Sequence, residues 1–505
     1  MSKILPFQSE LRPALPTIIG NVDYLKFEEE LKRMDEILRL SGVEKRFVET
    51  ALANWLEASE KGKTPGTRQQ RKYQKQCRQA LRCTVLQRIL GEGYRGMSRR
   101  LAECALFQWF CGIAQLDVVS VPSKSQMQRY THWLPIEQLE EMIEGLLQST
   151  VRTEAASGEN VLKLANQIEL DTVWLDATCV KANIHFPVDW KLLGDATRTL
   201  MQATQRIREH GLKERMEEPG VFVSRMNKLC IEMTHTGRKD KADSKKGRKR
   251  VLRKMKKLAK GVRDHALSHR DLLDKHWQET DWTRPQAEQV LGRIDDILLQ
   301  LPEAIKQAHE RIIGERLVKN EEKILSLYEK EVQVIVRGKA GAKVEFGNTL
   351  LLAEQAQGLI VDWKLYEDSA PSDDHQLPES LERIEKRIGA GVLRAMGGDR
   401  GFDSASNRRL LEEKEIFNGL CPRAVKGLEK RQKEERFKAM AKRRAQTEGR
   451  IGILKNEFFG NPMRSKGIEN RKLGVAWSVL AHNLWVLARL ERVKEPEEAE
   501  RLEAA

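Results

Sequence analysis

The position of the β-strand signals along the chain most constrains its fold. The apolar, β-rich run Val173–Val180 alternates its side chains between two faces, and Asp176 interrupts that run on one of them. Helical periodicity then dominates until strand signals resume at Val332. An early strand followed much later by strands that alternate with helices predicts an α/β fold with a mixed sheet. The long helical segment after the first strand is predicted to be an insertion into that fold.

The later part of the chain alternates between the two periodicities. Strands are predicted at residues 332–336, 343–353 and 358–365, in the run that ends at Asp399, and at 416–421. Helices are predicted at residues 381–388, around Leu410 and around Glu448, and in the insertion at 192–200, 251–262, 290–301 and 312–327. A last helix around Trp477 is apolar on one face, so we expect it to pack on the sheet or on a partner subunit.

The N-terminal segment contains short helical patterns separated by glycines. Ser98 is expected to cap a helix that Gly112 ends, and a further helix begins at Ser123 or Ser125 and displays Arg129. Small helices joined by such turns resemble a helix-turn-helix DNA reader, although a plain helical bundle would give the same pattern.

The length of the chain predicts several domains. A chain of 505 residues exceeds the size at which a single core stops growing. We predict a helical domain over residues 1–150, to which the helix-turn-helix resemblance assigns the binding of DNA ends, an α/β core over residues 165–190 and 330–495, and a basic helical insertion over residues 191–329.

Composition indicates the kind of partner and the compartment. The chain has 89 Lys and Arg against 74 Asp and Glu, a net charge of +15, which favours a polyanionic partner such as nucleic acid. A ribosome-associated or membrane-surface protein would have the same balance. The seven cysteines form no Cys-x-x-Cys pair, so they are predicted to be reduced thiols. Because no apolar run approaches about 18 residues and no signal peptide is recognisable, we expect a soluble, cytoplasmic protein.

The densest cationic run lies within the insertion. Its apolar residues repeat at helical spacing, which predicts an amphipathic helix with a cationic outer face. Such a run is often only a solvated surface, but the excess of one sign favours contact with phosphate. The predicted phosphate-binding residues in this run are Lys245, Lys246, Arg248, Lys249 and Arg250.

Three carboxylates stand in positions suited to phosphodiester chemistry. Asp176 lies in the first strand, Asp399 at the end of a later strand, and Glu448 on a helix. Arg444 and Lys455 lie four residues before and seven residues after Glu448, so all three face one side of that helix. The trio alone could be a solvated surface group. Together with the aspartates it suits Mg²⁺, which prefers hard oxygen ligands, and two such ions about 3.5–4 Å apart can act on both reacting oxygens of a phosphodiester.

These residues give the chain a resemblance to the DDE transposases of bacterial insertion sequences. Their signature helix carries Tyr, Arg, Glu and Lys, and here Arg444, Glu448 and Lys455 fall in register while Ala441 replaces the Tyr. The resemblance also covers residues 175–189, 398–404 and 94–134. It implies an RNase H-like catalytic core with a large helical insertion after the first strand.

The resemblance also implies a mechanism. Asp176 and Asp399 would be the principal metal ligands and Glu448 would hold the second ion, with Mn²⁺ able to substitute for Mg²⁺. Water would release a 3′-hydroxyl at the element end, and that hydroxyl would attack target DNA. Arg444 and Lys455 would grip the neighbouring phosphates. Asp403 is an alternative to Asp399, but we expect it to cap the next helix with Ser404.

The expected function is transposition, and therefore DNA recombination, of the protein's own element. The partners would be the DNA of the element ends and of the target, bound by a homodimer that assembles on DNA, in a bacterial cytoplasm at the nucleoid and without a membrane. One alternative is an RNase H-like DNA nuclease without strand transfer. Another is a non-catalytic DNA-binding protein derived from a transposon.

Overall fold

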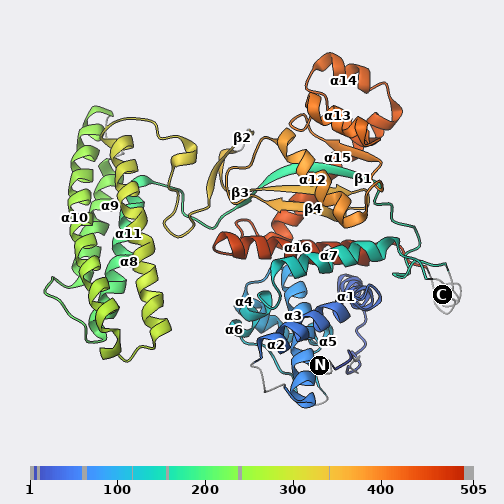
Figure 1. The fold of residues 1–505 in the computed structure, drawn as a ribbon, viewed down its shortest axis with the longest axis horizontal. Coiled ribbons are helices and arrows are strands. Elements are labelled where there is room, and N and C mark those ends of the chain that lie inside the picture. Colours follow the sequence, from blue (N-terminus) through green and yellow to red (C-terminus); the bar gives the residue numbers. More distant parts are fainter. Residues whose placement is uncertain are drawn as a thin grey trace. The chain divides into compact units, whose positions relative to one another are not determined.

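The computed structural model describes residues 5–7, 12–59, 65–115, 118–154, 158–236, 241–339 and 342–493. The chain divides into two compact units, each described here by itself (Figure 1). The first unit contains Met1–Lys181 and Asn348–Ala505, and the second contains Ala182–Gly347. The predicted division into three domains, with separate N-terminal and catalytic parts, remains a prediction.

The described strands form a six-stranded mixed sheet in the order β2-β3-β1-β5-β6, with β4 paired to β3. The pairs β1–β5 and β5–β6 are parallel, whereas β2–β3 and β3–β4 are antiparallel. The predicted α/β fold with a mixed sheet is therefore confirmed. The strands are β1 (Thr172–Lys181), β2 (Gln333–Lys339), β3 (Ala342–Gln355), β4 (Ile360–Leu365), β5 (Ala395–Gly398) and β6 (Phe417–Leu420).

Helices that follow the strands complete the α/β part of the first unit. Helix α15 crosses the sheet and contacts β1, β5 and β6. Helix α12 is fixed to β4 through the fully buried Asp362, which accepts hydrogen bonds from Arg383 and Arg387. These helices are α12 (Asp373–Ile388), α13 (Ala405–Glu413), α14 (Val425–Arg431) and α15 (Glu435–Ile453), and a π-helical turn (Leu454–Phe459) continues α15.

The N-terminal helices share one hydrophobic core with the sheet, and α16 (Ile468–Ala488) lies between them (Figure 1). This helix contacts β4 as well as α1, α3 and α7, so it is buried on almost every side and not on one face alone. The indole Nε1 of Trp477 donates to the carbonyl of Thr131 at 2.8 Å. The N-terminal helices are α1 (Val22–Leu40), α2 (Val43–Ala58), α3 (Thr67–Ile89), α4 (Tyr94–Glu103), α5 (Ala105–Cys111), α6 (Lys124–Thr131) and α7 (Ile136–Val151).

Two expectations about helix ends are wrong. Ser98 lies inside α4 instead of capping a helix, and its hydroxyl donates to the carbonyl of Pro122 at 2.7 Å. Residues 312–327 do not form an α-helix, because α11 ends at Ile312 and Glu315 adopts a left-handed φ of 54°, and only a short 3-10 helix (Asn320–Glu322) follows. By contrast, Ser123 caps α6, where it accepts from the backbone of Gln126.

The second unit contains the helices α8–α11, which pack around two apolar clusters (Figure 1). The longest of them, α10, contacts each of the other three. Their bounds are α8 (Asp189–Glu209), α9 (Pro219–Thr236), α10 (Lys241–His276) and α11 (Arg284–Ile312).

Two general expectations can be compared with the described residues. All seven cysteines are free thiols, as their spacing predicted. In the part of the chain that the structure describes, no helix is both long enough and apolar enough to cross a lipid bilayer.

Candidate active site

One face of β1 meets α15 and the turn that follows it. Side chains alternate along a strand, so Trp174, Asp176 and Thr178 share this face. The indole of Trp174 donates to the carbonyl of Met440 at 3.0 Å, and Lys455 Nζ donates to Thr178 Oγ1 at 3.1 Å. Along β1, Asp176 therefore lies between a residue that contacts α15 and a residue that contacts the π-helical turn after α15.

Asp399 lies directly after β5, beside β1. The parallel register pairs Trp174 with Gly397, so Asp176 and Asp399 are two residues further along adjacent strands. The Asp399 carboxylate accepts a hydrogen bond from the backbone of Gly401 at 2.8 Å. A Cβ at position 401 would come within 2.9 Å of that carboxylate and within 2.3 Å of the Asp373 carboxylate. A glycine is needed there because two acidic side chains close on its backbone.

Glu448 is the most exposed of the three predicted ligands. It lies on α15, its side chain is 62% exposed, and it accepts a hydrogen bond from Arg444 Nη2 at 3.2 Å. Ala441, which stands where the resemblance has a tyrosine, is exposed on the same helix.

The three carboxylates influence one another electrostatically. The pKa of Asp176 is raised to about 6, chiefly by burial and next by the negative charge of Asp399. The guanidinium of Arg444 opposes these effects, followed by the backbone of Ala177, while Glu448 adds a smaller upward contribution. The charges of Asp399, Glu448 and Arg444 therefore all lie close enough to change the pKa of Asp176.

Among the described residues, however, no three acidic, histidine or cysteine side chains are close enough together to hold one metal ion. The structure places Asp176 on β1 and Asp399 directly after the adjacent β5, but leaves Glu448 paired with Arg444. Like charges disfavour a closer approach when no cation is present. The chemistry of the group nevertheless suits divalent cations, because the donors are hard oxygens and negative charge exceeds positive charge.

Helix α15 is held in place by residues that sequence reasoning missed. Glu354 on β3 is 1% exposed and accepts hydrogen bonds from Arg443 at 3.0 Å and from Arg450 at 2.6 Å. Both arginines also donate to the carbonyl of Ala356. Arg443 and Arg450 are seven residues apart, so their shared helix face was visible in the sequence, but their buried partner was not.

Asp403, the alternative ligand, has a structural role. It is buried, and its carboxylate accepts from Arg408 at 2.7 Å and from the backbone of Arg423 at 3.1 Å. Ser404 caps α13 without it, accepting from the backbone of Asn407. The expectation that Asp403 joins this cap is therefore wrong.

The predicted phosphate-binding residues of α10 lie in different environments. Lys245 and Lys249 both form ion pairs with Glu315, at 2.8 and 2.7 Å. The Arg250 guanidinium lies 3.2 Å from Glu232.

Of the other predicted DNA-binding residues, one packs against a tryptophan and two are exposed. Arg248 lies over the ring of Trp190, with 5.1 Å between the guanidinium carbon and the ring centre. Lys246 is exposed, and so is Arg129 on α6. Arg129 also lines a shallow pocket with Tyr73 and His132.

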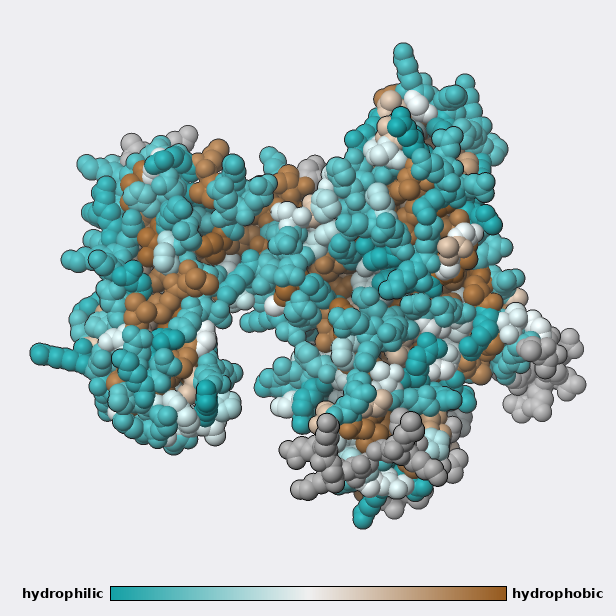
Figure 2. Space-filling model, in the orientation of Figure 1, coloured by the Kyte–Doolittle hydropathy of each residue, from teal (hydrophilic) through white to brown (hydrophobic). Residues whose placement is uncertain are grey.

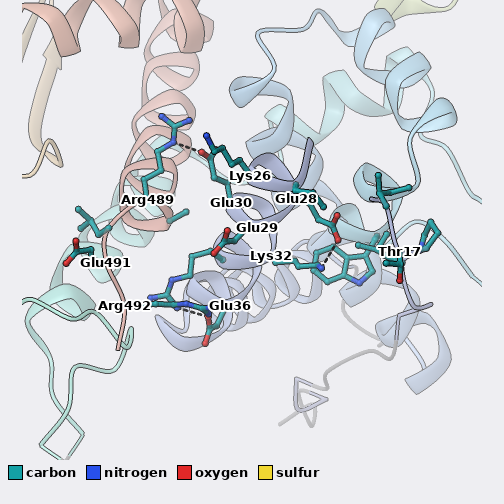
Figure 3. A pocket seen from close by; sticks show the side chains of 18 residues that line it. Thr17, Lys26, Glu28, Glu29, Glu30, Lys32, Glu36, Arg489, Glu491 and Arg492 are labelled. Carbon is teal, nitrogen blue, oxygen red and sulfur yellow. Dashed lines mark hydrogen bonds and ion pairs between the residues drawn. The ribbon is translucent and has the colours of Figure 1, made fainter. Parts of the chain in front are cut away.

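A pocket of the first unit lies apart from these residues. It has a volume of about 1540 Å³ and is lined by α1, the segment before it and the residues after α16 (Figure 3). Its charges are balanced, because Glu30 pairs with Arg489 at 2.8 Å and Glu28 pairs with Lys32 at 2.6 Å. None of the predicted site residues lines it.

Comparison with protein families covers the segment that contains β5 and α15, but not β1. Residues 338–484 match the model of the Transposase DDE domain. The resemblance to DDE transposases is confirmed. No curated protein and no solved structure gives a significant match. The matched transposase segment contains Asp399 and Glu448, whereas Asp176 precedes it. The match supports a transposase-type function, which implies an enzyme of the nuclease or transposase class that acts on DNA.

Proposed function

We propose that this protein is a DNA transposase that cleaves the ends of its own element and joins them to target DNA. The observation that carries the proposal is the position of Asp176 and Asp399 at the same level of adjacent parallel strands, with the Glu448 helix across that face. The Transposase DDE domain match supports it independently. The proposal includes an RNase H-like core, which the mixed order β3-β1-β5-β6 supports.

In this proposal the three carboxylates hold divalent cations, Mg²⁺ or Mn²⁺ in its place. Asp176 and Asp399 would be the principal ligands, and Glu448 would turn from Arg444 towards the second ion. The cations would lower the pKa of the attacking water and stabilise charge on the scissile phosphate. Water oxygen would bond to phosphorus and the P–O3′ bond would break, releasing the 3′-hydroxyl. In the joining step that hydroxyl would displace a strand of target DNA by transesterification.

Arg444 on α15 and Lys455 in the π-helical turn after it would bind the DNA backbone near these carboxylates. Arg444, once released from Glu448, presents a planar guanidinium that can bond two phosphate oxygens. Lys455 is held beside Asp176 through Thr178 and offers a point charge. The predicted contacts of Arg129 with DNA, and a homodimer assembled on DNA, remain part of the proposal.

The test uses linear DNA that contains the reading frame and its flanking sequences, incubated with the full-length protein and Mg²⁺. We expect Asp176→Asn, Asp399→Asn and Glu448→Gln each to abolish cleavage and to leave binding of this DNA intact, because the basic surface is unchanged. Glu435→Gln is the matched control, since its carboxylate lies on the same helix and is 88% exposed.

The products distinguish the alternatives. Cleavage without joined products would indicate a nuclease without strand transfer. Binding without any Mg²⁺-dependent cleavage by the unaltered protein would indicate a non-catalytic DNA-binding protein. Full cleavage by any one of the three variants would remove that residue from the site.

A further inference from the structure

The cations of α10 form two sets that the sequence does not separate. The first set is paired with carboxylates of the second unit: Lys245 and Lys249 share Glu315, and Arg250 pairs with Glu232. The two lysines lower the pKa of Glu315 to about 2, so this carboxylate stays ionised at any ordinary pH.

The second set runs along the exposed face of the same helix. In the described part of the chain, none of its members forms an ion pair or side-chain hydrogen bond with an acidic residue, and all of them are exposed. The residues of this set, which we call the α10 stripe, are Lys246, Arg253, Lys254, Lys257 and Lys260.

Packing fixes the direction in which the α10 stripe points. The opposite face of the helix is formed by Val251, Met255, Ala259 and Val262, all buried in the apolar clusters of the unit. Rotation of α10 would expose this apolar face, so the stripe stays on the surface. The edge of the unit where Figure 1 places α10 is mostly hydrophilic in Figure 2.

The excess positive charge ends abruptly along the helix. Beyond Lys260, Arg263 bonds to the adjacent Asp264, and Arg270 bonds to Asp274 and Asp295. The unbalanced part therefore spans residues 246–260, which at 1.5 Å per residue is about 21 Å of helix. Each strand of duplex DNA presents one phosphate per 3.4 Å of axis, so about six phosphates of one strand occupy that length.

We propose that the α10 stripe binds the phosphate backbone of duplex DNA, while Lys245, Lys249 and Arg250 maintain the second unit. Like charges three and four residues apart disfavour a helix, and a polyanion alongside would remove that repulsion. This inference rests on the proposed function, because it takes DNA as the partner. It assigns the contacts to the cations of α10 that have no acidic partner among the described residues, and not to the whole cationic run.

The test compares two triple variants with the same loss of charge. The stripe variant is Arg253→Gln, Lys257→Gln and Lys260→Gln, and the control is Lys245→Gln, Lys249→Gln and Arg250→Gln. Both are made in the full-length protein, and binding to a 30-base-pair duplex of arbitrary sequence is measured in EDTA across a range of salt concentrations. Each lost phosphate contact reduces the log–log salt slope by about 0.9. We expect a reduction of up to about 2.7 for the stripe variant and less than about 0.9 for the control.

Equal slopes for the two variants, or a larger change in the control, would overturn the proposal. A stripe variant that bound DNA normally but lost binding to phosphatidylserine vesicles would also overturn it, in favour of a membrane surface. If the triple variant does not fold, Lys257→Gln alone should still lower the slope by up to about 0.9. Because the measurement needs no cleavage, a protein that binds through the stripe but does not cut DNA would refute only the proposed function.

Discussion

Two groups of carboxylates lie along α15, and they differ in how their charge is compensated. Glu354 is buried and accepts hydrogen bonds from two arginines of the helix. Asp176, Asp399 and Glu448 share the field of Arg444, which bonds to Glu448. Glu354 has two cationic partners, whereas the three site carboxylates outnumber the two nearby cations, Arg444 and Lys455.

This difference separates the parts that position the helix from the parts that can bind a ligand. The buried Glu354 carboxylate accepts from two arginines of α15 through Oε1, so Glu354 fixes where α15 crosses the sheet. The site carboxylates carry more negative charge than the neighbouring cations neutralise, and a divalent metal site requires such an excess. Arg443 and Arg450, which bond to Glu354, lie on one side of α15, and Arg444 and Glu448, which we propose to bind DNA and metal, lie on another.

The largest effect on stability is expected from removing the Glu354 carboxylate. Glu354→Ala leaves Arg443 and Arg450 without their buried partner, and we expect it to lower the free energy of unfolding by about 3–5 kcal/mol in urea denaturation. The exposed Glu435→Gln on the same helix should change it by less than about 1 kcal/mol. If the two variants were equally stable, Glu354 would not anchor the helix.

An intermediate effect on stability is expected from removing the charge of Asp176. The folded-state pKa of Asp176, about 6, lies above its ordinary value, so ionisation costs the folded protein stability as pH rises from about 4 to above 6. In EDTA, Asp176→Asn should therefore be the more stable protein at pH 7.5, by on the order of 2 kcal/mol, with little difference at pH 4.

Added Mg²⁺ should reverse this order at pH 7.5, because the metal stabilises only the charged site. Thermal unfolding at both pH values, with and without Mg²⁺, gives the four measurements. If Asp176→Asn were less stable than the unaltered protein in EDTA at pH 7.5, ionised Asp176 would not destabilise the metal-free protein.

The smallest effect is expected from removing Arg444. Its pair with Glu448 is largely exposed, so Arg444→Gln should cost no more than about 1 kcal/mol of unfolding free energy. Because Arg444 lowers the pKa of Asp176, the pH at which the folded protein loses stability should move upward in this variant. Lys442→Gln, an exposed neighbour on α15, should leave that transition unchanged.

Local periodicity was sufficient to predict much of this molecule. The alternation around Asp176 predicted β1, the apolar spacing predicted part of α10, and the spacing of Arg444 and Glu448 predicted α15. These features follow from neighbouring residues, because the repeat of a strand or helix is written into a few turns of chain. Lys455, predicted on the same helix, instead lies in the π-helical turn after α15. Helix ends were less secure, as Ser98 and residues 312–327 illustrate, since capping depends on which partner the side chain finds.

The tertiary structure alone decided which distant residues meet. The adjacency of β1 and β5, the burial of α16 on almost every side, the Glu354 anchor and the division of the α10 cations all depend on contacts between segments far apart in the chain. A sequence states that a side chain is charged and which face of its helix it occupies. Whether that charge is buried against a partner or left free for a ligand is fixed only when the folded chain brings two faces together.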